Sequence, residues 1–132
     1  MTHYLSEITR IREICYRNQG QLDTVIGIRK YINDHFDEEL SLELLSDVHC
    51  TSKFHLLRLF KQYYGLTPKQ FHIERRLHRA KALLLGGANI AETCYDVGFE
   101  SPSSFSTLFK ARFGSTPSDF RKRATFAKSD SY

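Results

Sequence analysis

The sequence lacks the features that would place the chain in a membrane or on a secretory route. No apolar run approaches the roughly 20 residues that a membrane-spanning helix needs, and the start, Met1–Glu7, lacks the basic and then apolar pattern of a signal peptide. There are only three cysteines, Cys15, Cys50 and Cys94, and none lies in a CxxC pair. Because three cannot all pair within one chain, we expect buried thiols in a reducing cytoplasm, and no membrane contact.

The chain also lacks the residue patterns that catalysis and cofactor binding usually require. None of its six histidines stands four residues from another, which excludes an HExxH-like metal site. There is no glycine-rich phosphate loop, and no set of serine, histidine and aspartate suggests itself. We therefore expect a protein that is not an enzyme and that has no metal site and no cofactor.

Strand signals are nearly absent, because no segment alternates with a period of two and no Asn-Gly hairpin turn occurs. Apolar residues recur instead at helical spacing, which predicts an all-α fold of seven or eight mostly short helices. A chain of 132 residues supports one compact domain, or two small ones that share a connecting element. The predicted helices cover about 5–16, 23–36, 42–48, 53–65, 68–85, 90–97 and 117–123, and a further helix begins at Ser101-Pro102.

Capping residues set the predicted boundaries. Asn18–Gly20 should end the first helix, with Gly20 as a left-handed cap, and Asp23 or Thr24 should begin the second. Ser41 and Ser52 are suitable N-caps. Thr-Pro pairs at 67–68 and 116–117 should each open a helix, since proline is favoured at the first helical position. The first helix should cap the domain through Leu5, Ile8, Ile11 and Cys15, with contact to a partner as the alternative, and the residues from Ala124 onward should fray.

An internal repeat begins at Glu43. Each copy predicts a short helix, a tight turn and a second helix, which is the helix-turn-helix arrangement. Two copies are too few for a solenoid, so the repeat favours a target that is itself periodic, namely the DNA double helix. Identical residues 49 positions apart include Glu43/Glu92, Asp47/Asp96, Val48/Val97, Ser52/Ser101, Leu59/Leu108, Phe60/Phe109, Lys61/Lys110, Gly65/Gly114, Thr67/Thr116, Pro68/Pro117 and Phe71/Phe120.

Charge is segregated along the chain, although the net charge is only +4. Six acidic residues and no Lys or Arg lie between Asp34 and Asp47, whereas eight basic residues and one acidic residue lie between Lys53 and Lys81. Such segregation favours a polyanionic partner, and a solvated helix surface is the alternative.

The second helix of the first copy predicts a base-reading surface. Leu56, Leu59 and Phe60 are predicted core positions, and the outward face carries Phe54, Leu57 and Arg58. Arg58 could donate two hydrogen bonds to guanine, and the two apolar residues could contact thymine methyl groups. Packing of Phe54 or Leu57 on the N-terminal segment is the alternative. The phosphate contacts that we predict for both copies and the connecting helix are Ser52, Lys53, Lys61, Arg75, Arg76, Arg79, Ser101, Ser106 and Lys110.

The corresponding face of the second copy carries small hydroxyl residues and no Arg, Asn or Gln, so we expect it to discriminate little between bases. The helix that connects the copies should span about 27 Å at about 1.5 Å per residue. Because successive major grooves lie about 34 Å apart, one chain could occupy two of them as a monomer. An asymmetric site and a modest DNA bend are expected.

These residues make the chain resemble the DNA-binding domain of the AraC/XylS family of bacterial transcription regulators. The resemblance runs from about Thr24 to Arg123 and is most specific over Ile90–Glu92 and Val97–Ser106, with Phe109-Lys110, Phe113–Pro117 and Phe120-Arg121. It implies a bacterial regulator, usually an activator that contacts RNA polymerase. The family's base-contacting positions fall here on Phe54, Leu57, Arg58, Pro102, Ser103, Ser104 and Thr107.

Two departures from the family stand out. Thr107 replaces a common basic residue, which weakens specific reading by the second copy, and His49-Cys50 stands where a glycine often lies. The 23 residues before Thr24 are too few for a sensor domain, so the chain is either a stand-alone member or a fragment. A protein-interaction module is the alternative function. The predicted organisation is an N-terminal extension (1–23), a first unit (24–66), a connecting helix (67–87), a second unit (88–123) and a tail (124–132).

Overall fold

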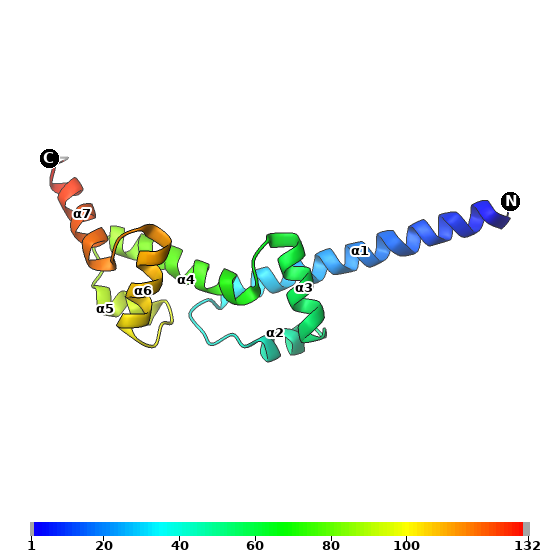
Figure 1. Ribbon diagram of the computed structural model, residues 1–132, viewed down its shortest axis with the longest axis horizontal. Helices are drawn as coiled ribbons and strands as arrows, with labels where there is room; N and C mark the ends of the chain where they lie inside the picture. The colour runs from blue at the N-terminus through cyan, green and yellow to red at the C-terminus, as the bar shows by residue number, and fades with distance from the viewer. Residues whose placement is uncertain (1, 131–132) are drawn as a thin grey trace. The chain divides into compact units, whose positions relative to one another are not determined.

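The computed structural model describes residues 2–130, which contain seven helices and no strand. Within this range no helix is long and apolar enough to span a membrane. The residues form two compact units, Met1–Asp34 with Ser41–Pro68 (unit 1) and His35–Leu40 with Lys69–Tyr132 (unit 2). The all-α prediction is confirmed. Figure 1 labels the helices as α1 (Thr2–Asp34), α2 (Leu42–Val48), α3 (Lys53–Tyr64), α4 (Pro68–Leu85), α5 (Ile90–Asp96), α6 (Pro102–Phe113) and α7 (Pro117–Asp130).

Helix α1 is continuous, so the predicted break at residues 18–20 is wrong. Gly20 is not among the glycines with positive φ, and the Thr24 hydroxyl donates to the Gly20 carbonyl 2.9 Å away rather than capping a new helix. Gln19 donates across one turn to Asp23 at 3.1 Å. A glycine inside a helix costs only about 1 kcal/mol relative to alanine, which side-chain bonds and packing can outweigh.

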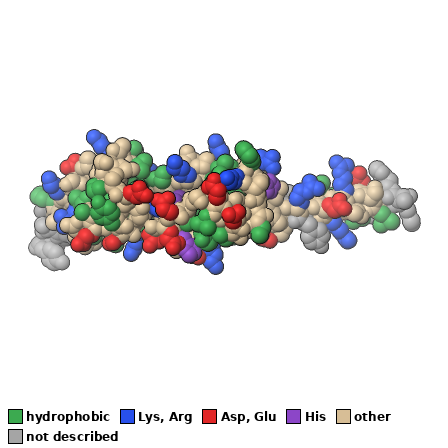
Figure 2. Space-filling view, turned by 90° about the horizontal axis from the view of Figure 1, so that it is seen from below, with side chains coloured by type: hydrophobic (Ala, Val, Ile, Leu, Met, Phe, Trp, Pro, Cys, Tyr) green, Lys and Arg blue, Asp and Glu red, His purple; other side chains and the backbone are tan. Residues whose placement is uncertain are grey.

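The apolar stripe predicted in the N-terminal half of α1 is largely exposed. Leu5 and Ile11 are 61% and 56% exposed, and Cys15 is exposed as well. Apolar and basic side chains are both visible along this part of the helix (Figure 2). The predictions that this stripe caps the domain, and that Cys15 and Cys50 are buried, are therefore wrong, whereas Cys94 is buried as expected.

The core of unit 1 forms where α1 meets α3. Val25, Ile28 and Ile32 of α1 are fully buried, as are Leu56 and Phe60 of α3. The expected caps are present, since Ser41 and Ser52 accept backbone N–H bonds at the starts of α2 and α3. Within α2, Leu45 is buried, but Val48 is 45% exposed.

The core of unit 2 is an aromatic and aliphatic cluster between α4, α5 and α6. Its buried members include Leu77, Leu84, Val97, Phe105 and Phe109, and Phe36 and Phe120 pack against it. Helix α7 continues to Asp130, and residues 131–132 lie outside the described part, so the expected fraying from Ala124 onward stays a prediction.

The repeat changes register inside the helix-turn-helix. The first helices match at a spacing of 48 residues, because Ser41 and Asn89 are their N-caps and His49 and Val97 their C-caps. The second helices match at 49, with Ser52 and Ser101 as N-caps. Glu100 is thus an extra residue in the second turn. The predicted pairing of Val48 with Val97 is wrong, since Val48 is 45% exposed and Val97 fully buried.

This register places Cys50 at the position of Gly98, and both have positive φ (49° and 99°). A residue with a Cβ in the left-handed region is strained by roughly 1–2 kcal/mol. We expect Cys50→Gly to raise the free energy of unfolding by about 1 kcal/mol in urea titrations.

Cys15→Gly is the matched control for this substitution. Because Cys15 lies within α1, the same change should lower stability by a few tenths of a kcal/mol to about 1 kcal/mol. Destabilisation by Cys50→Gly would contradict the strain at this turn.

Candidate nucleic-acid interface

The most exposed apolar side chain of α3 lies where base reading was predicted. Phe54 is 87% exposed, Leu57 is half-buried, and Arg58 and Lys61 are exposed. We call Phe54, Arg58 and Lys61 the α3 ridge. Packing of Phe54 on the N-terminal segment is excluded by its exposure. Such a side chain on a free surface costs solvation energy, which a ligand in contact with it would recover.

One nitrogen of the Arg58 guanidinium is hydrogen-bonded within α3. Its Nη2 donates to Nδ1 of His55 at 3.1 Å, across one helical turn. Since a guanidinium has five N–H donors and no acceptor, Nδ1 must accept, and most donors of Arg58 remain available. The contact therefore orients the guanidinium and leaves its other N–H groups able to bind a ligand.

Lys53 is engaged in the structure rather than free for a phosphate. Its Nζ lies 2.7 Å from Oε1 of Glu43 on α2, and this hydrogen bond lowers the pKa of the Glu43 carboxyl below its usual value. Both side chains are largely exposed, so the pair contributes little stability and can be exchanged for another anion.

The exposed face of α6 is occupied by local hydrogen bonds. The Thr107 hydroxyl donates to the Ser103 carbonyl at 2.9 Å, and Ser101 accepts from the backbone N–H of Ser104 at 3.3 Å. Pro102, Ser103 and Ser104 are exposed and Ser106 is half-buried. As an N-cap, Ser52 still has a hydroxyl proton to donate, which suits a phosphate better than a base, whereas the Ser101 hydroxyl lies 3.4 Å from that of Ser103.

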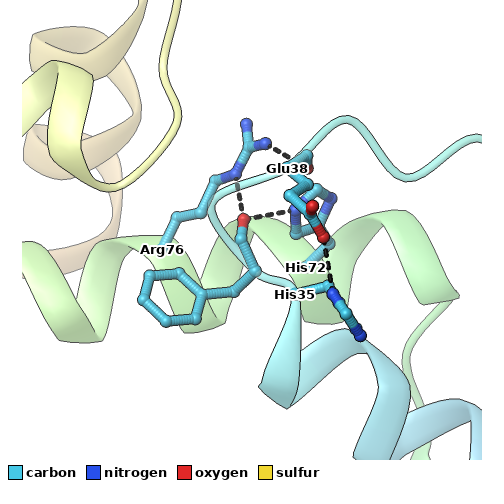
Figure 3. Close-up of polar contacts among 5 residues, drawn as sticks. His35, Glu38, His72 and Arg76 are labelled. Atoms are coloured by element: carbon cyan, nitrogen blue, oxygen red, sulfur yellow. Dashed lines mark hydrogen bonds and ion pairs between the residues drawn. The ribbon is translucent and has the colours of Figure 1, made fainter.

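Arg76 contradicts its predicted role as a phosphate contact. It is only 8% exposed, its Nε donates to the Phe36 carbonyl at 2.7 Å, and its Nη2 donates to the Glu38 carbonyl at 2.8 Å. Burial lowers its pKa. Figure 3 shows this guanidinium directed at the backbone of the 35–40 segment. Arg75 and Arg79, by contrast, are exposed on α4.

His72 binds the same 35–40 segment as Arg76, and the sequence did not indicate this role for either residue. Its Nε2 donates to the Phe36 carbonyl at 2.7 Å, so this oxygen accepts two hydrogen bonds (Figure 3). Burial lowers the pKa of His72, which keeps it neutral. We call Arg76 and His72 the loop anchor. Their position on α4 carried no signal in the sequence, because an exposed and a buried basic residue look alike there.

Other charged residues near α6 serve packing. Arg112 contacts Glu74 through Nε and Nη2 at 2.7–2.9 Å, and His78 lies 2.7 Å from the same carboxylate. Partial burial would raise the pKa of Glu74, but these hydrogen bonds outweigh it and the pKa is lowered. Over the described residues, no group of three or more His, Cys, Asp or Glu could hold a metal ion.

Comparison with known proteins matches these features. The family described as "Helix-turn-helix domain" matches residues 45–123. Over 96 residues the chain is 36% identical to the bifunctional transcriptional activator/DNA repair enzyme AdaA of Bacillus subtilis, covering 72% of this chain and 46% of AdaA. Over 106 residues it is 37% identical to the HTH-type transcriptional activator RhaS of an Enterobacter species, covering 80% of this chain and 37% of RhaS. The chain thus spans less than half the length of either relative.

A solved structure with the same fold is the DNA-binding domain of AdpA, a global transcriptional factor, in complex with a target DNA. It superimposes with a TM-score of 0.71 at 25% sequence identity, covering 75% of this chain and 90% of that domain. The relatives and this structure are all named as transcription factors or activators.

Proposed function

The chain belongs to the AraC/XylS family of helix-turn-helix DNA-binding domains, and we propose that it is a sequence-specific, double-stranded DNA-binding transcription regulator. The α3 ridge carries this proposal. It places an 87% exposed phenylalanine beside an arginine with available donors, on a helix of the size that a major groove admits. No catalytic step is proposed for this chain.

The two units contribute unequally in this proposal. Phe54, Leu57 and Arg58 of α3 read base edges, whereas Ser103, Ser104 and Thr107 of α6 make contacts of low discrimination. Lys53, Lys61, Arg75, Arg79 and Lys110 neutralise phosphates, with hydroxyl contacts from Ser52, Ser101 and Ser106. The expected DNA site is asymmetric.

Partners and location follow from the same proposal. Because one chain contains both helix-turn-helix units, one copy suffices to occupy two successive major grooves. The names of AdaA and RhaS favour activation, and we infer contact with RNA polymerase at the bound site. A regulator of this kind acts in the bacterial cytoplasm, where the chromosome lies.

Replacement of Arg58 tests the proposal. Arg58→Ala should weaken binding to the preferred duplex by about 1–3 kcal/mol, and should relax specificity at one base pair. The affinities would be measured by fluorescence anisotropy on a duplex that the chain selects from a random library, and on all single-base variants of it. Lys61→Ala is the control and should weaken all duplexes alike. If Arg58→Ala also weakens all of them alike, Arg58 is a phosphate contact.

A further inference from the structure

Unit 1 contains a pocket that the proposed function does not use. Its volume is about 460 Å³, and it lies between α1 and the turn that leads into α3. The residues that line it are Arg17, Gly20, Gln21, Thr24, His49, Cys50, Thr51 and His55. All eight belong to unit 1, and the pocket reaches the first turn of α3 through His55.

The lining is rich in donors and contains no carboxylate among its eight residues, all of them described. Arg17 contributes a permanent positive charge, and Gln21 and Thr51 contribute polar side chains. Nδ1 of His55 accepts from Arg58, so the remaining ring proton of His55 lies on Nε2 and can be donated. A pocket with one guanidinium, several neutral donors and no acidic residue suits an anion with several oxygens.

The position of the pocket beside α3 favours a phosphate as the anion. His55 precedes Arg58 by one turn and contacts it at 3.1 Å, whereas Lys53 lies on the flank of α3 that faces Glu43 of α2. The α3 ridge therefore stands between a flank bound to α2 and a flank that opens on Arg17. A groove-bound α3 would have a DNA strand along each of these flanks.

We propose that this pocket binds a phosphate group, with Arg17 as its main charge and Gln21, Thr51 and His55 as supporting donors. The phosphate is either one of the DNA backbone beside α3, which rests on the proposed function, or that of a free phosphorylated molecule. In the first case α1, upstream of the matched family region, adds a contact that fixes α3 in the groove. In the second, a small phosphate ligand occupies the place of the DNA strand.

Whether the pocket binds a phosphate of the DNA backbone is tested with Arg17→Ala and the matched control Arg12→Ala. Arg12 is exposed on the same helix but five residues away, so it points to a different side. In anisotropy titrations over a salt series with a selected duplex, Arg17→Ala should make the slope of log K against log salt shallower by about 1, equally on all sequences. Arg12→Ala should leave the slope unchanged.

Whether the pocket binds a free phosphate is tested on the DNA-free chain by NMR titration with inorganic phosphate at constant ionic strength. Saturable shifts of Gln21, Thr51 and His55 that disappear in Arg17→Ala would assign the pocket to a free phosphate. The inference is overturned if Arg17→Ala matches Arg12→Ala in the salt series and phosphate causes no such shifts. If the wild-type chain binds no duplex, the proposed function fails, and the phosphate titration alone decides the pocket.

Discussion

Gly98→Ala is expected to lower the free energy of unfolding of unit 2 by about 3–5 kcal/mol, because backbone strain adds to the loss of buried hydrogen bonds. The φ angle of Gly98 is 99°, and a Cβ there would lie 2.6 Å from the Asp37 carbonyl oxygen and 2.9 Å from the Arg76 guanidinium. Neither neighbour can yield easily. The oxygen is backbone, and the guanidinium is fixed by its bonds to Phe36 and Glu38.

Substitutions of two other glycines, measured in the same urea titrations, separate the contribution of backbone strain from that of the close approach of neighbouring atoms. Gly114 has a φ of 82° with nothing within 4 Å of a built Cβ, so Gly114→Ala should cost only the strain of about 1–2 kcal/mol. Gly20 lies in α1 with open space around it, and Gly20→Ala should stabilise by up to about 1 kcal/mol. Equal losses for Gly98→Ala and Gly114→Ala would show that the close approach of Asp37 and Arg76 is unimportant.

Arg76→Ala is expected to destabilise unit 2 by about 2–4 kcal/mol, since it leaves the Glu38 carbonyl without its donor and removes one of two donors from Phe36. A cavity beside the ring of Phe99, over which the guanidinium lies at 5.6 Å, adds to the loss. Chemical denaturation would measure the change.

The adjacent Arg75 provides the contrast. It is exposed, so Arg75→Ala should change stability by less than about 0.5 kcal/mol and should weaken DNA binding with a shallower salt slope. Arg76→Ala should therefore lower stability, whereas Arg75→Ala should lower DNA affinity. Lowered DNA affinity at unchanged stability for Arg76→Ala would restore its predicted role as a phosphate contact.

Local chemistry explains what the sequence predicted well. The N-caps Ser41 and Ser52 lie where expected, because each satisfies a backbone group within a few residues of itself, as the left-handed C-caps Gly65 and Gly114 also do. The buried stripes of α3 and α6 follow from helical periodicity. Exposure of Phe54 agrees with the prediction for the same reason, since it lies opposite Leu56 and Phe60 on the helix.

The predictions were wrong where contacts between residues far apart in the sequence determine the structure. Whether Arg76 is buried depends on the 35–40 segment, which is far from it in sequence. The extra residue Glu100 was hidden because identities at a spacing of 49 continue on both sides of it, although the caps of α2 and α5 match at 48. The pocket beside Arg17 was missed because α1 was expected to break at Gly20, which would have separated Arg17 from the unit 1 core.

The central claim, that this chain binds DNA through several phosphate contacts and reads sequence with α3, is tested most directly by the salt dependence of binding. The affinity for a duplex selected from a random library would be measured by anisotropy between about 50 and 200 mM salt, with an unrelated duplex in parallel. The five exposed cationic contacts of the proposed function, with Arg17 not counted, predict a slope of log K against log salt at least as steep as about −4.5, at about −0.9 per phosphate. This corresponds to a loss of several hundred-fold over that range, with the selected duplex binding more tightly throughout. A flat dependence, or equal affinity for both duplexes, would contradict the account.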